Sequence, residues 1–237
     1  MKVAVLSDIH ANWPALEAVL ADCPPVDEVI CLGDVIGYGA DPVRCADEVM
    51  KRGWATLIGN HDIACVNEEI RQWFNDDAAS VIRWTAEELA DKQLQWLRAL
   101  PVQQEIHDAL LVHASPRDPT FEYILDAYSA YANLERIEDR VCFHGHTHLP
   151  GIFAIAGDEV VHEYELGEHR LLGPQLVNPG SVGQPRDGNP DASYGVWDVD
   201  ASSFEFRRVA YDREAAKRAI REARLPERFA SRLDSGR

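Results

Sequence analysis

The sequence predicts an α/β fold with a parallel sheet in its first part and antiparallel hairpins in its second part. Two observations carry this prediction. Over the first sixty residues, short apolar runs alternate with helix-like stretches, which is the pattern of βαβ units. Beyond Pro150, apolar and polar residues alternate in pairs of segments joined by short turns, which is the pattern of hairpins.

The parallel part repeats one unit three times. The Val- and Leu-rich runs KVAVLSD, DEVICLGD and WATLIGNHD each end in a polar loop, and residues 12–22 and 41–52 between them are helix-like. Asp8, Asp34 and Asn60 are each 26 positions apart, a suitable length for one strand–helix–strand unit. We therefore expect these residues just past the C-terminal ends of parallel strands, where open α/β sheets bind ligands.

The remaining segments complete the expected organisation. A helical stretch covers about 66–100, and the strand-and-loop segments ALLVHASP and RVCFHGHTH enclose a partly helical region at 123–140. GIFAIA with EVVHEYEL predicts one hairpin, SYGVWDVD with SFEFRRVAYD predicts a second, and Asp212 begins a final amphipathic helix. With no linker or repeat, we expect one domain over 1–237, with a helical insert at about 66–100 and a helical tail at about 212–237.

Composition and charge limit the classes of partner. The formal net charge is −17, whereas a long nucleic-acid partner usually requires a basic stripe, so DNA and RNA are disfavoured. A small phosphorylated substrate fits, because bound metal ions would override the acidic surface locally. The five cysteines are scattered without CxxC spacing, which favours a reducing compartment. We find neither a membrane-spanning run nor a signal peptide, and we expect a cytoplasmic protein with no membrane partner.

Five polar loops carry the candidate chemistry. They are Asp8-Ile9-His10, Gly33-Asp34, Gly59-Asn60-His61-Asp62, His113, and Gly145-His146-Thr147-His148. Each motif is weak alone, although an H-x-H at a strand end can chelate because alternate side chains point the same way. Together they gather carboxylates that would repel one another unless cations neutralised them. The combination therefore predicts a metal site.

The order and spacing of these loops resemble the calcineurin-like metallophosphoesterase superfamily, whose pattern is D-x-H, G-D, G-N-H-D/E, H and G-H-x-H. Flanking segments such as SDIHANWPALEAVL, VHASPRDP and NPGSVGQPRDG narrow the resemblance to small prokaryotic phosphodiesterases and diadenosine polyphosphate hydrolases. The resemblance covers about 1–211 of the chain. It implies a four-layer α/β/β/α sandwich, in which two mixed β-sheets are flanked by helices.

The resemblance also implies a pair of divalent metal ions. Asp8, His10 and His148 would hold one ion, Asn60, His113 and His146 would hold the other, and Asp34 would bridge both. These ligands are oxygen and nitrogen donors with no thiolate, which suits Mn²⁺, Fe or Zn²⁺. We expect Mn²⁺.

Four further residues receive roles from the same resemblance. His61 matches the catalytic histidine, which protonates the leaving oxygen or stabilises charge in the transition state. Asp62 is expected to hold the His61 imidazole and keep it charged. Arg186 and Tyr38 are candidates for substrate binding.

The leading functional hypothesis is hydrolysis of phosphoester or phosphoanhydride bonds in a small molecule, a nucleotide or dinucleoside polyphosphate, by a phosphodiesterase-type enzyme. A protein serine/threonine phosphatase with the same metal pair is the alternative. A metal-binding scaffold without turnover belongs to a third class, but its metal site should be eroded, and here every motif is complete. The oligomeric state stays open.

Two expectations concern the helical insert. Trp73, Trp84 and Trp96 have helix-face spacing and are expected in the core rather than in a base-stacking surface. The insert itself is expected to form one wall of the active-site cleft and to limit substrate size.

Overall fold

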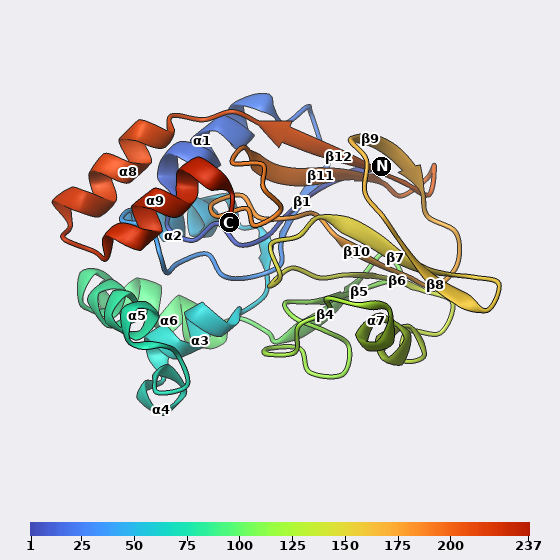
Figure 1. Ribbon diagram of the computed structural model, residues 1–237, viewed down its shortest axis with the longest axis horizontal. Helices are drawn as coiled ribbons and strands as arrows, with labels where there is room; N and C mark the ends of the chain where they lie inside the picture. Colours follow the sequence, from blue (N-terminus) through green and yellow to red (C-terminus); the bar gives the residue numbers. More distant parts are fainter.

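The computed structural model describes residues 1–237 as two six-stranded sheets packed face to face, with helices outside them (Figure 1). The first sheet contains β1 (Lys2–Leu6), β2 (Glu28–Cys31), β3 (Ala55–Thr56), β9 (Gly167–Arg170), β11 (Ala192–Asp198) and β12 (Ser203–Val209). Its strand order is β3-β2-β1-β11-β12-β9. The pairs β1/β2 and β2/β3 are parallel, and the remaining pairs are antiparallel.

The second sheet is mixed in the same way. It contains β4 (Gln103–Ile106), β5 (Ala109–Val112), β6 (Val141–Phe143), β7 (Gly151–Ala156), β8 (Glu159–Glu163) and β10 (Gln175–Asn178). Its order is β4-β5-β6-β10-β7-β8, with β5, β6 and β10 parallel to one another. The two predicted hairpins are β7/β8 and β11/β12, one in each sheet.

The helices fall into three sets. The N-terminal set comprises α1 (Trp13–Asp22), α2 (Pro42–Arg52), α3 (Asn60–Val66), α4 (Glu68–Arg71), α5 (Asp76–Glu88) and α6 (Asp91–Ala99). A single helix, α7 (Ala127–Leu134), covers the second sheet, and α8 (Arg213–Glu222) and α9 (Glu227–Ser235) end the chain. No helix is both long enough and apolar enough to cross a bilayer.

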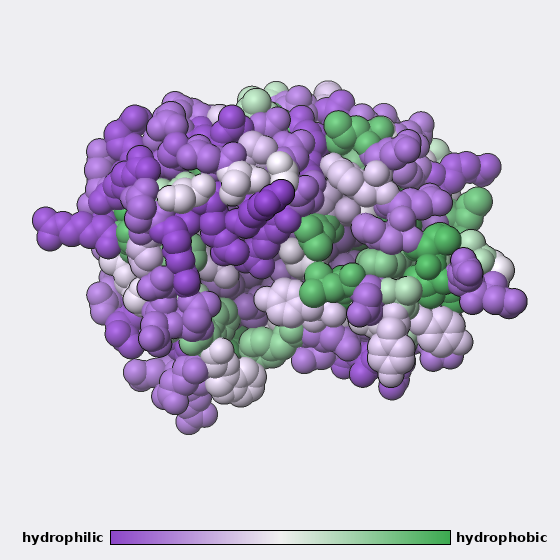
Figure 2. Space-filling model, viewed as in Figure 1, coloured by the Kyte–Doolittle hydropathy of each residue, from purple (hydrophilic) through white to green (hydrophobic).

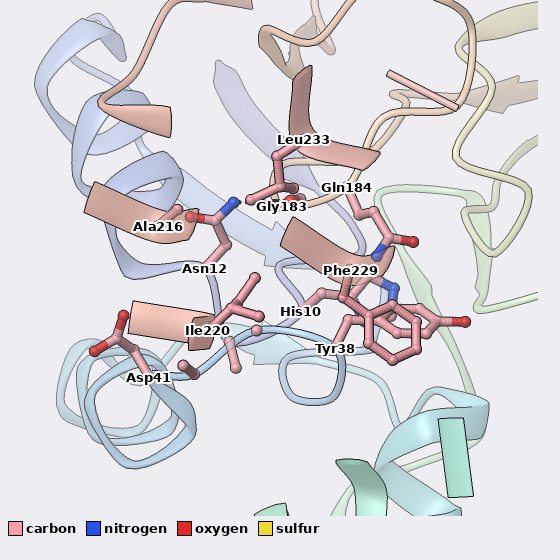
Figure 3. A pocket seen from close by; sticks show the side chains of 13 residues that line it. His10, Asn12, Tyr38, Asp41, Gly183, Gln184, Ala216, Ile220, Phe229 and Leu233 are labelled. Atoms are coloured by element: carbon pink, nitrogen blue, oxygen red, sulfur yellow. Dashed lines mark hydrogen bonds between the residues drawn. The ribbon is translucent and has the colours of Figure 1, made fainter. Parts of the chain in front are cut away.

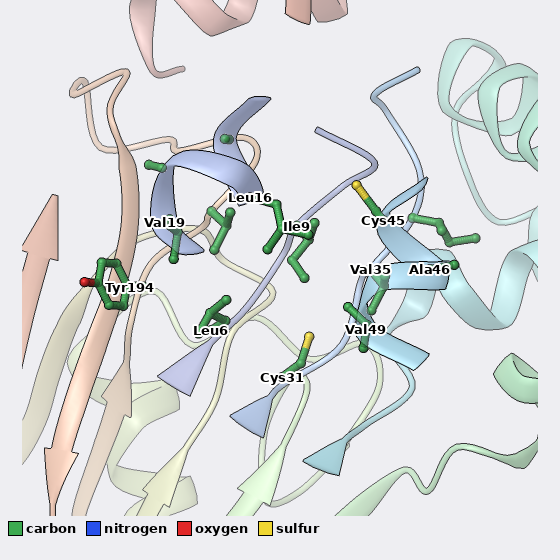
Figure 4. Packing of buried hydrophobic residues seen from close by; sticks show 14 of the residues in the cluster. Leu6, Ile9, Leu16, Val19, Cys31, Val35, Cys45, Ala46, Val49 and Tyr194 are labelled. Carbon is green, nitrogen blue, oxygen red and sulfur yellow. The ribbon is translucent and has the colours of Figure 1, made fainter. Parts of the chain in front are cut away.

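Three apolar contacts hold the four layers together. Between the sheets, Phe143 of the second sheet meets Trp197 and Phe204 of the first, and all three side chains are buried. Outside the first sheet, Leu16 and Val19 of α1 pack with Tyr194 of β11, as Figure 4 shows. Outside the second sheet, apolar side chains of α7 pack on β5, β6 and β10. The α/β/β/α sandwich is therefore confirmed.

Local sequence explains where the first helices begin and end. Asn12 caps α1, because its side-chain oxygen accepts a hydrogen bond from the Ala15 amide. The second helix begins at Pro42, where a missing amide hydrogen costs nothing, and ends at Arg52, directly before the capping residue Gly53. Gly53 has a φ of 64°, a left-handed conformation that favours glycine.

The helical insert differs from its prediction in two respects. Helix begins at Asn60, six residues before the expected start, so the motif residues Asn60, His61 and Asp62 form the first turn of α3. Trp73 is 68% exposed, and its prediction as a core residue was wrong. It lies in the turn between α4 and α5, while Trp84 and Trp96 lie in α5 and α6, so helical spacing does not relate the three.

Hydrophilic and hydrophobic residues are distributed unevenly over the surface shown in Figure 2. Hydrophilic residues dominate the side formed by α5, α8 and α9. Hydrophobic residues gather on the opposite side, over β7 and β8. Exposed apolar side chains on and near these elements include Leu125, Ile155 and Leu166.

The contact between the sheets predicts a large effect of truncating Phe204. We expect Phe204→Ala to lower the free energy of unfolding by about 3–5 kcal/mol, because the fully buried ring leaves a cavity between two rigid sheets. Urea denaturation measures this change. The control Leu172→Ala removes a side chain that is 64% exposed and should change the free energy by less than about 0.5 kcal/mol. Equal effects in the two variants would contradict a structural role of Phe204 in the contact between the sheets.

Candidate active site

The seven candidate metal ligands come from five loops and meet at one place. The loops follow β1, β2, β3, β5 and β6, so both sheets contribute their C-terminal strand ends. None of the seven side chains is more than 5% exposed; they are Asp8, His10, Asp34, Asn60, His113, His146 and His148. The structure therefore brings together every ligand that the sequence predicted.

Asp8, His10 and His148 form the first ligand group. The Nε2 atoms of His10 and His148 lie 3.0 Å apart. The Oδ1 atom of Asp8 lies 3.3 Å from His148 Nε2 and 3.7 Å from His10 Nε2. Donor atoms of all three residues lie within 4.8 Å of one another, which is close enough to hold one ion.

Asn60, His113 and His146 form the second ligand group, which Asp34 joins to the first. His113 Nε2 lies 3.0 Å from Asn60 Oδ1 and 3.5 Å from Asp34 Oδ2. The same Oδ2 atom lies 3.7 Å from His10 Nε2 in the first group. Asp34 therefore has the central position that a bridging ligand requires.

Backbone carbonyls orient the imidazole rings. The Nδ1 atoms of His10, His113 and His148 lie 3.2, 2.9 and 2.5 Å from the carbonyl oxygens of Ile36, Leu32 and Gln184, respectively. A carbonyl oxygen only accepts, so each Nδ1 carries a proton and each Nε2 is directed at the site, where it presents a lone pair when the ring is neutral. His146 is reversed, because its Nε2 lies 3.2 Å from the Phe121 carbonyl and its Nδ1 is left for the site.

The donor atoms fit a pair of divalent cations. The lone pairs of His10 Nε2 and His148 Nε2 face each other, and the buried Asp8 Oδ1 beside them has no hydrogen-bond partner. Three acceptors that converge without a proton between them repel unless a cation lies among them. The set contains only oxygen and nitrogen donors, which suits Mn²⁺, Fe or Zn²⁺.

Protonation states agree with this fit. Burial alone would raise the pKa of the Asp8 carboxyl, but the surrounding imidazoles of His148 and His113 together outweigh it and the pKa is lowered. Burial likewise opposes ionisation of Asp34, yet His113 and His61 hold its pKa well below the ordinary value. Both carboxylates are therefore ionised, which is the state that binds a divalent cation.

The histidines divide into two kinds. Burial lowers the pKa of His10, His148 and His146, the last to about 3, so these rings are neutral and can donate a lone pair. Burial also acts to lower the pKa of His113, but Asp34, Asp8 and the Leu32 carbonyl together outweigh it and raise the pKa to about 9. His113 is therefore protonated, and its positive charge lies beside Asp34, at the place where a bound metal cation would supply positive charge instead.

The ligand loops have unusual backbone conformations. Five of the seven candidate ligands have positive φ angles between 49° and 64°; they are Asp8, His10, Asp34, His146 and His148. Non-glycine residues adopt this left-handed region rarely, at a cost of about 1–3 kcal/mol each, and such strain concentrates at functional sites. This backbone conformation lets the tight loops direct their donor atoms into the site, whereas extended strand ends would direct them away from it.

Glycines next to the ligands permit the close approach of these loops. A Cβ atom at Gly59 would lie 2.1 Å from Asp34 Oδ1, and one at Gly145 would lie 1.9 Å from Ser7 Oγ. Both distances are far below van der Waals contact. The G-N-H-D and G-H-x-H motifs therefore require glycine for space rather than for chemistry.

His61 lies beside both ligand groups. Its backbone N–H donates to Asp34 Oδ1 at 2.8 Å, and one ring nitrogen lies within 4.8 Å of donor atoms of His10 and Asp34. The ring is 3% exposed, and its Nδ1 has no hydrogen-bond partner. Burial lowers the pKa of this imidazole to about 4.

Asp62 does not hold the His61 imidazole, and that prediction was wrong. The Asp62 carboxylate instead accepts hydrogen bonds from the backbone amides of Gly59, Ile36 and Val35, at 3.0, 3.2 and 3.3 Å. The physical reason is helical geometry: Asp62 is the third residue of α3, so its side chain reaches back to the helix start. Asp62 therefore joins the loop after β2 to the loop after β3 beneath the site.

The two substrate-binding candidates are in contact. Arg186 donates from Nη2 to the Tyr38 hydroxyl at 3.3 Å and to Gln184 Oε1 at 3.1 Å. Arg186 forms no ion pair, and its buried Nε has no partner. Tyr38 packs against both the His10 and the His61 ring, at centroid distances of 4.6 and 4.3 Å. A guanidinium beside the site with spare donors can bind a phosphate.

The C-terminal helices support Tyr38 from behind. Figure 3 shows the Phe229 ring of α9 beside Tyr38 and His10, and the Tyr38–Phe229 centroid distance is 4.9 Å. The cavity between these helices and the His10 loop has a volume of about 10 Å³, room for no more than one water molecule. The helical tail therefore positions the site wall and offers no separate ligand pocket here.

Sequence reasoning missed three aromatic residues around the site. Phe74 packs edge-on against His61 at 4.9 Å, and Tyr123 stacks on His146 at 3.9 Å. Phe121 contributes the carbonyl that orients His146. No motif marks these residues, because each lies in an irregular segment whose path depends on the packing of the whole chain.

Comparisons with known proteins agree with this geometry. Residues 1–202 match the calcineurin-like phosphoesterase superfamily domain. An uncharacterized protein of Methanocaldococcus jannaschii is 36% identical over 244 residues, which cover 99% of this chain and 98% of that protein. The phosphodiesterase YfcE of Escherichia coli is 27% identical over 215 residues, which cover 86% of this chain and 90% of YfcE.

A solved structure is similar over the full length. The crystal structure of a metallophosphoesterase from Sphaerobacter thermophilus superimposes with a TM-score of 0.88 and 38% identity, covering 100% of this chain and 99% of that one. The family implies divalent metal ions, and the two ligand groups are residues that could bind them. The chain therefore belongs to the calcineurin-like phosphoesterase superfamily and is a phosphoric ester hydrolase.

Proposed function

We propose that the protein is a dinuclear metal-dependent phosphodiesterase that acts on a small phosphorylated molecule, a nucleotide or a dinucleoside polyphosphate. One observation carries the proposal: Asp34 joins two groups of buried oxygen and nitrogen donors, with His61 beside both. Two divalent cations at these groups, when bound, supply the Lewis acidity that activates water and neutralises phosphoryl oxygens.

The chain's own residues complete the chemistry in this proposal. The unpartnered imidazole of His61 faces the reacting phosphoryl group and donates a proton or hydrogen bond to the leaving oxygen. Arg186 binds a non-reacting phosphoryl oxygen, and Tyr38 holds the guanidinium in place through its hydroxyl. Asp62 positions the two ligand loops and does not touch substrate.

Burial supports a small substrate. The ligands are at most 5% exposed, and Phe74, Tyr123 and Tyr38 surround them with ring contacts to His61, His146 and His10. A protein phosphatase needs a broad open groove instead. The phosphodiesterase named among the relatives, at 27% identity, supports a diester, and the net charge of −17 disfavours long nucleic acid.

Metal binding predicts a thermal shift. We expect Mn²⁺ at about 100 times its dissociation constant to raise the midpoint of thermal unfolding by about 5–10 °C, because it binds only the folded chain. Scanning fluorimetry and elemental analysis check this, with two ions per chain expected. Asp34→Asn should abolish most of the shift, whereas the exposed turn variant Asp158→Asn should retain it. A full shift in Asp34→Asn would argue against a bridging role.

His61 predicts a separation of catalysis from metal binding. With bis(p-nitrophenyl) phosphate and Mn²⁺, His61→Ala should lower kcat by about 10²–10⁴-fold, the usual contribution of a positioned proton donor. Its metal content should stay at two ions. The matched control is His169→Ala on β9, a partly buried histidine remote from the site whose Nε2 lies 2.8 Å from the Glu165 carbonyl oxygen. Loss of one ion from His61→Ala would make His61 a ligand instead.

Asp62 predicts a stability effect. Asp62→Asn replaces one acceptor oxygen by a donor that faces backbone amides, so the free energy of unfolding should fall by about 1–3 kcal/mol. Chemical denaturation measures this loss. An unchanged stability together with a shifted pH profile of kcat would restore the direct role at His61 that the geometry denies.

Substrate class is tested by comparing esters. Rates on bis(p-nitrophenyl) phosphate should exceed those on p-nitrophenyl phosphate, and dinucleoside polyphosphates should be cleaved in preference to a phosphoserine peptide. Preference for the peptide would support the protein phosphatase alternative. Two bound ions without turnover on any ester would support the scaffold.

A further inference from the structure

An aromatic pair of one exposed and one partly buried ring, Trp73 and Phe121, lies next to the proposed active site. Trp73, in the turn between α4 and α5, is 68% exposed, which is unusual for the largest apolar side chain. Its ring centroid lies 5.1 Å from that of Phe121, in the loop between β5 and α7. The two residues are 48 positions apart, so tertiary packing brings them together.

Both partners of this pair connect directly to site residues. The Phe121 carbonyl accepts the hydrogen bond that orients His146, at 3.2 Å. On the other side, Phe74 follows Trp73 in the chain and packs against His61 at 4.9 Å. The Trp73–Phe121 contact therefore joins the helical insert to the loop between β5 and α7.

Tyr123 continues the aromatic surface toward the phosphate-binding residues. It is 47% exposed and lies nearly parallel to the His146 ring, with centroids 3.9 Å apart and an interplanar angle of 29°. The Tyr123 phenol also lies close to the Arg186 guanidinium, which opposes the rise in the pKa of the phenol that burial causes. A molecule whose phosphate meets Arg186 thus has aromatic faces within reach on the same side of the site.

We propose that Trp73 and Phe121 form a stacking platform for a nucleobase of the substrate. This inference rests on the proposed function and identifies residues that select nucleotides over other phosphate esters. Aromatic side chains stack with bases at useful strength and with little preference among them, since every base has a π face. The platform therefore predicts selection for a nucleoside without strong selection for one base.

The kinetic test uses two diesters with the same leaving group. Thymidine 5′-(p-nitrophenyl phosphate) carries a base, and ethyl p-nitrophenyl phosphate does not. Trp73→Ala should raise KM for the thymidine ester about tenfold and leave kcat within about twofold, because stacking is lost while the metal groups stay intact. Kinetics on the ethyl ester should not change.

Two control variants isolate the aromatic face. Trp73→Phe keeps a stacking ring and should retain most of the affinity for the thymidine ester. Tyr128→Ala removes an aromatic side chain that is 83% exposed on α7 and has no ring contact with the site, so it should have no effect. If Trp73→Phe behaves as Trp73→Ala, the ring does not act by stacking.

A binding experiment decides the inference without turnover. Calorimetry in Mn²⁺ compares α,β-methylene adenosine diphosphate with methylenediphosphonate, which lacks the nucleoside. Wild-type protein should bind the nucleotide analogue about tenfold more tightly, and Trp73→Ala should bind both equally. Equal affinities in the wild type, or an unchanged preference in Trp73→Ala, would overturn the platform. Failure to hydrolyse either diester would refute the proposed function alone, since the calorimetric comparison does not depend on catalysis.

Discussion

The rest of the site depends on the burial of two ionised carboxylates, Asp8 and Asp34, among imidazoles. Each carboxylate is fully enclosed, and its charge persists there only because positive or polarisable partners lie around it. Asp34 makes contacts with both ligand groups and with His61. One oxygen faces His10 and His113 in the two ligand groups, and the other accepts the backbone N–H of His61. Gly59 must be glycine because that second oxygen occupies the space a Cβ atom would need.

Placing these groups requires a rigid frame. Left-handed backbone at five ligand positions costs free energy that the loops do not recover by themselves. The frame is the pair of sheets, joined by the buried contacts of Phe143, Trp197 and Phe204, whose parallel strands end at one edge. Asp62 then links the loops after β2 and β3 through three backbone hydrogen bonds. Stability and site geometry are thus parts of the same structure, and this places Asp62 in support rather than in catalysis.

The two ligand groups and the aromatic residues around them lie in different kinds of segment. The ligands follow strand ends, whereas the aromatic residues around them lie in irregular segments of the insert, of the loop before α7 and of the loop after β2. Under the proposed function, the sheets position the groups that act on the phosphoryl bond, and the loops and helices that pack over them form the wall that contacts the rest of the substrate. The helical tail belongs to this wall as well, since Phe229 supports Tyr38.

The sequence alone predicted the α/β class, both hairpins and the polar motifs at five strand ends, because polar loops directly after apolar strands mark the strand ends of a sheet. The family resemblance selected seven candidate ligands within these motifs, and the structure brings their side chains together. Sequence reasoning missed β4, β9 and β10, short strands of four residues. β9 and β10 pair with strands that are distant in the chain, whereas β4 (QQEI) forms a tight hairpin with β5 but has almost no apolar residues to mark it. Sequence reasoning also misplaced Trp73 and misassigned Asp62. Periodicity cannot show that α4 ends after one turn, nor that a carboxylate next to His61 in sequence points away from its ring. Only the tertiary structure decided these points, because they depend on which atoms of distant segments meet, and residue order carries no direct information on such contacts.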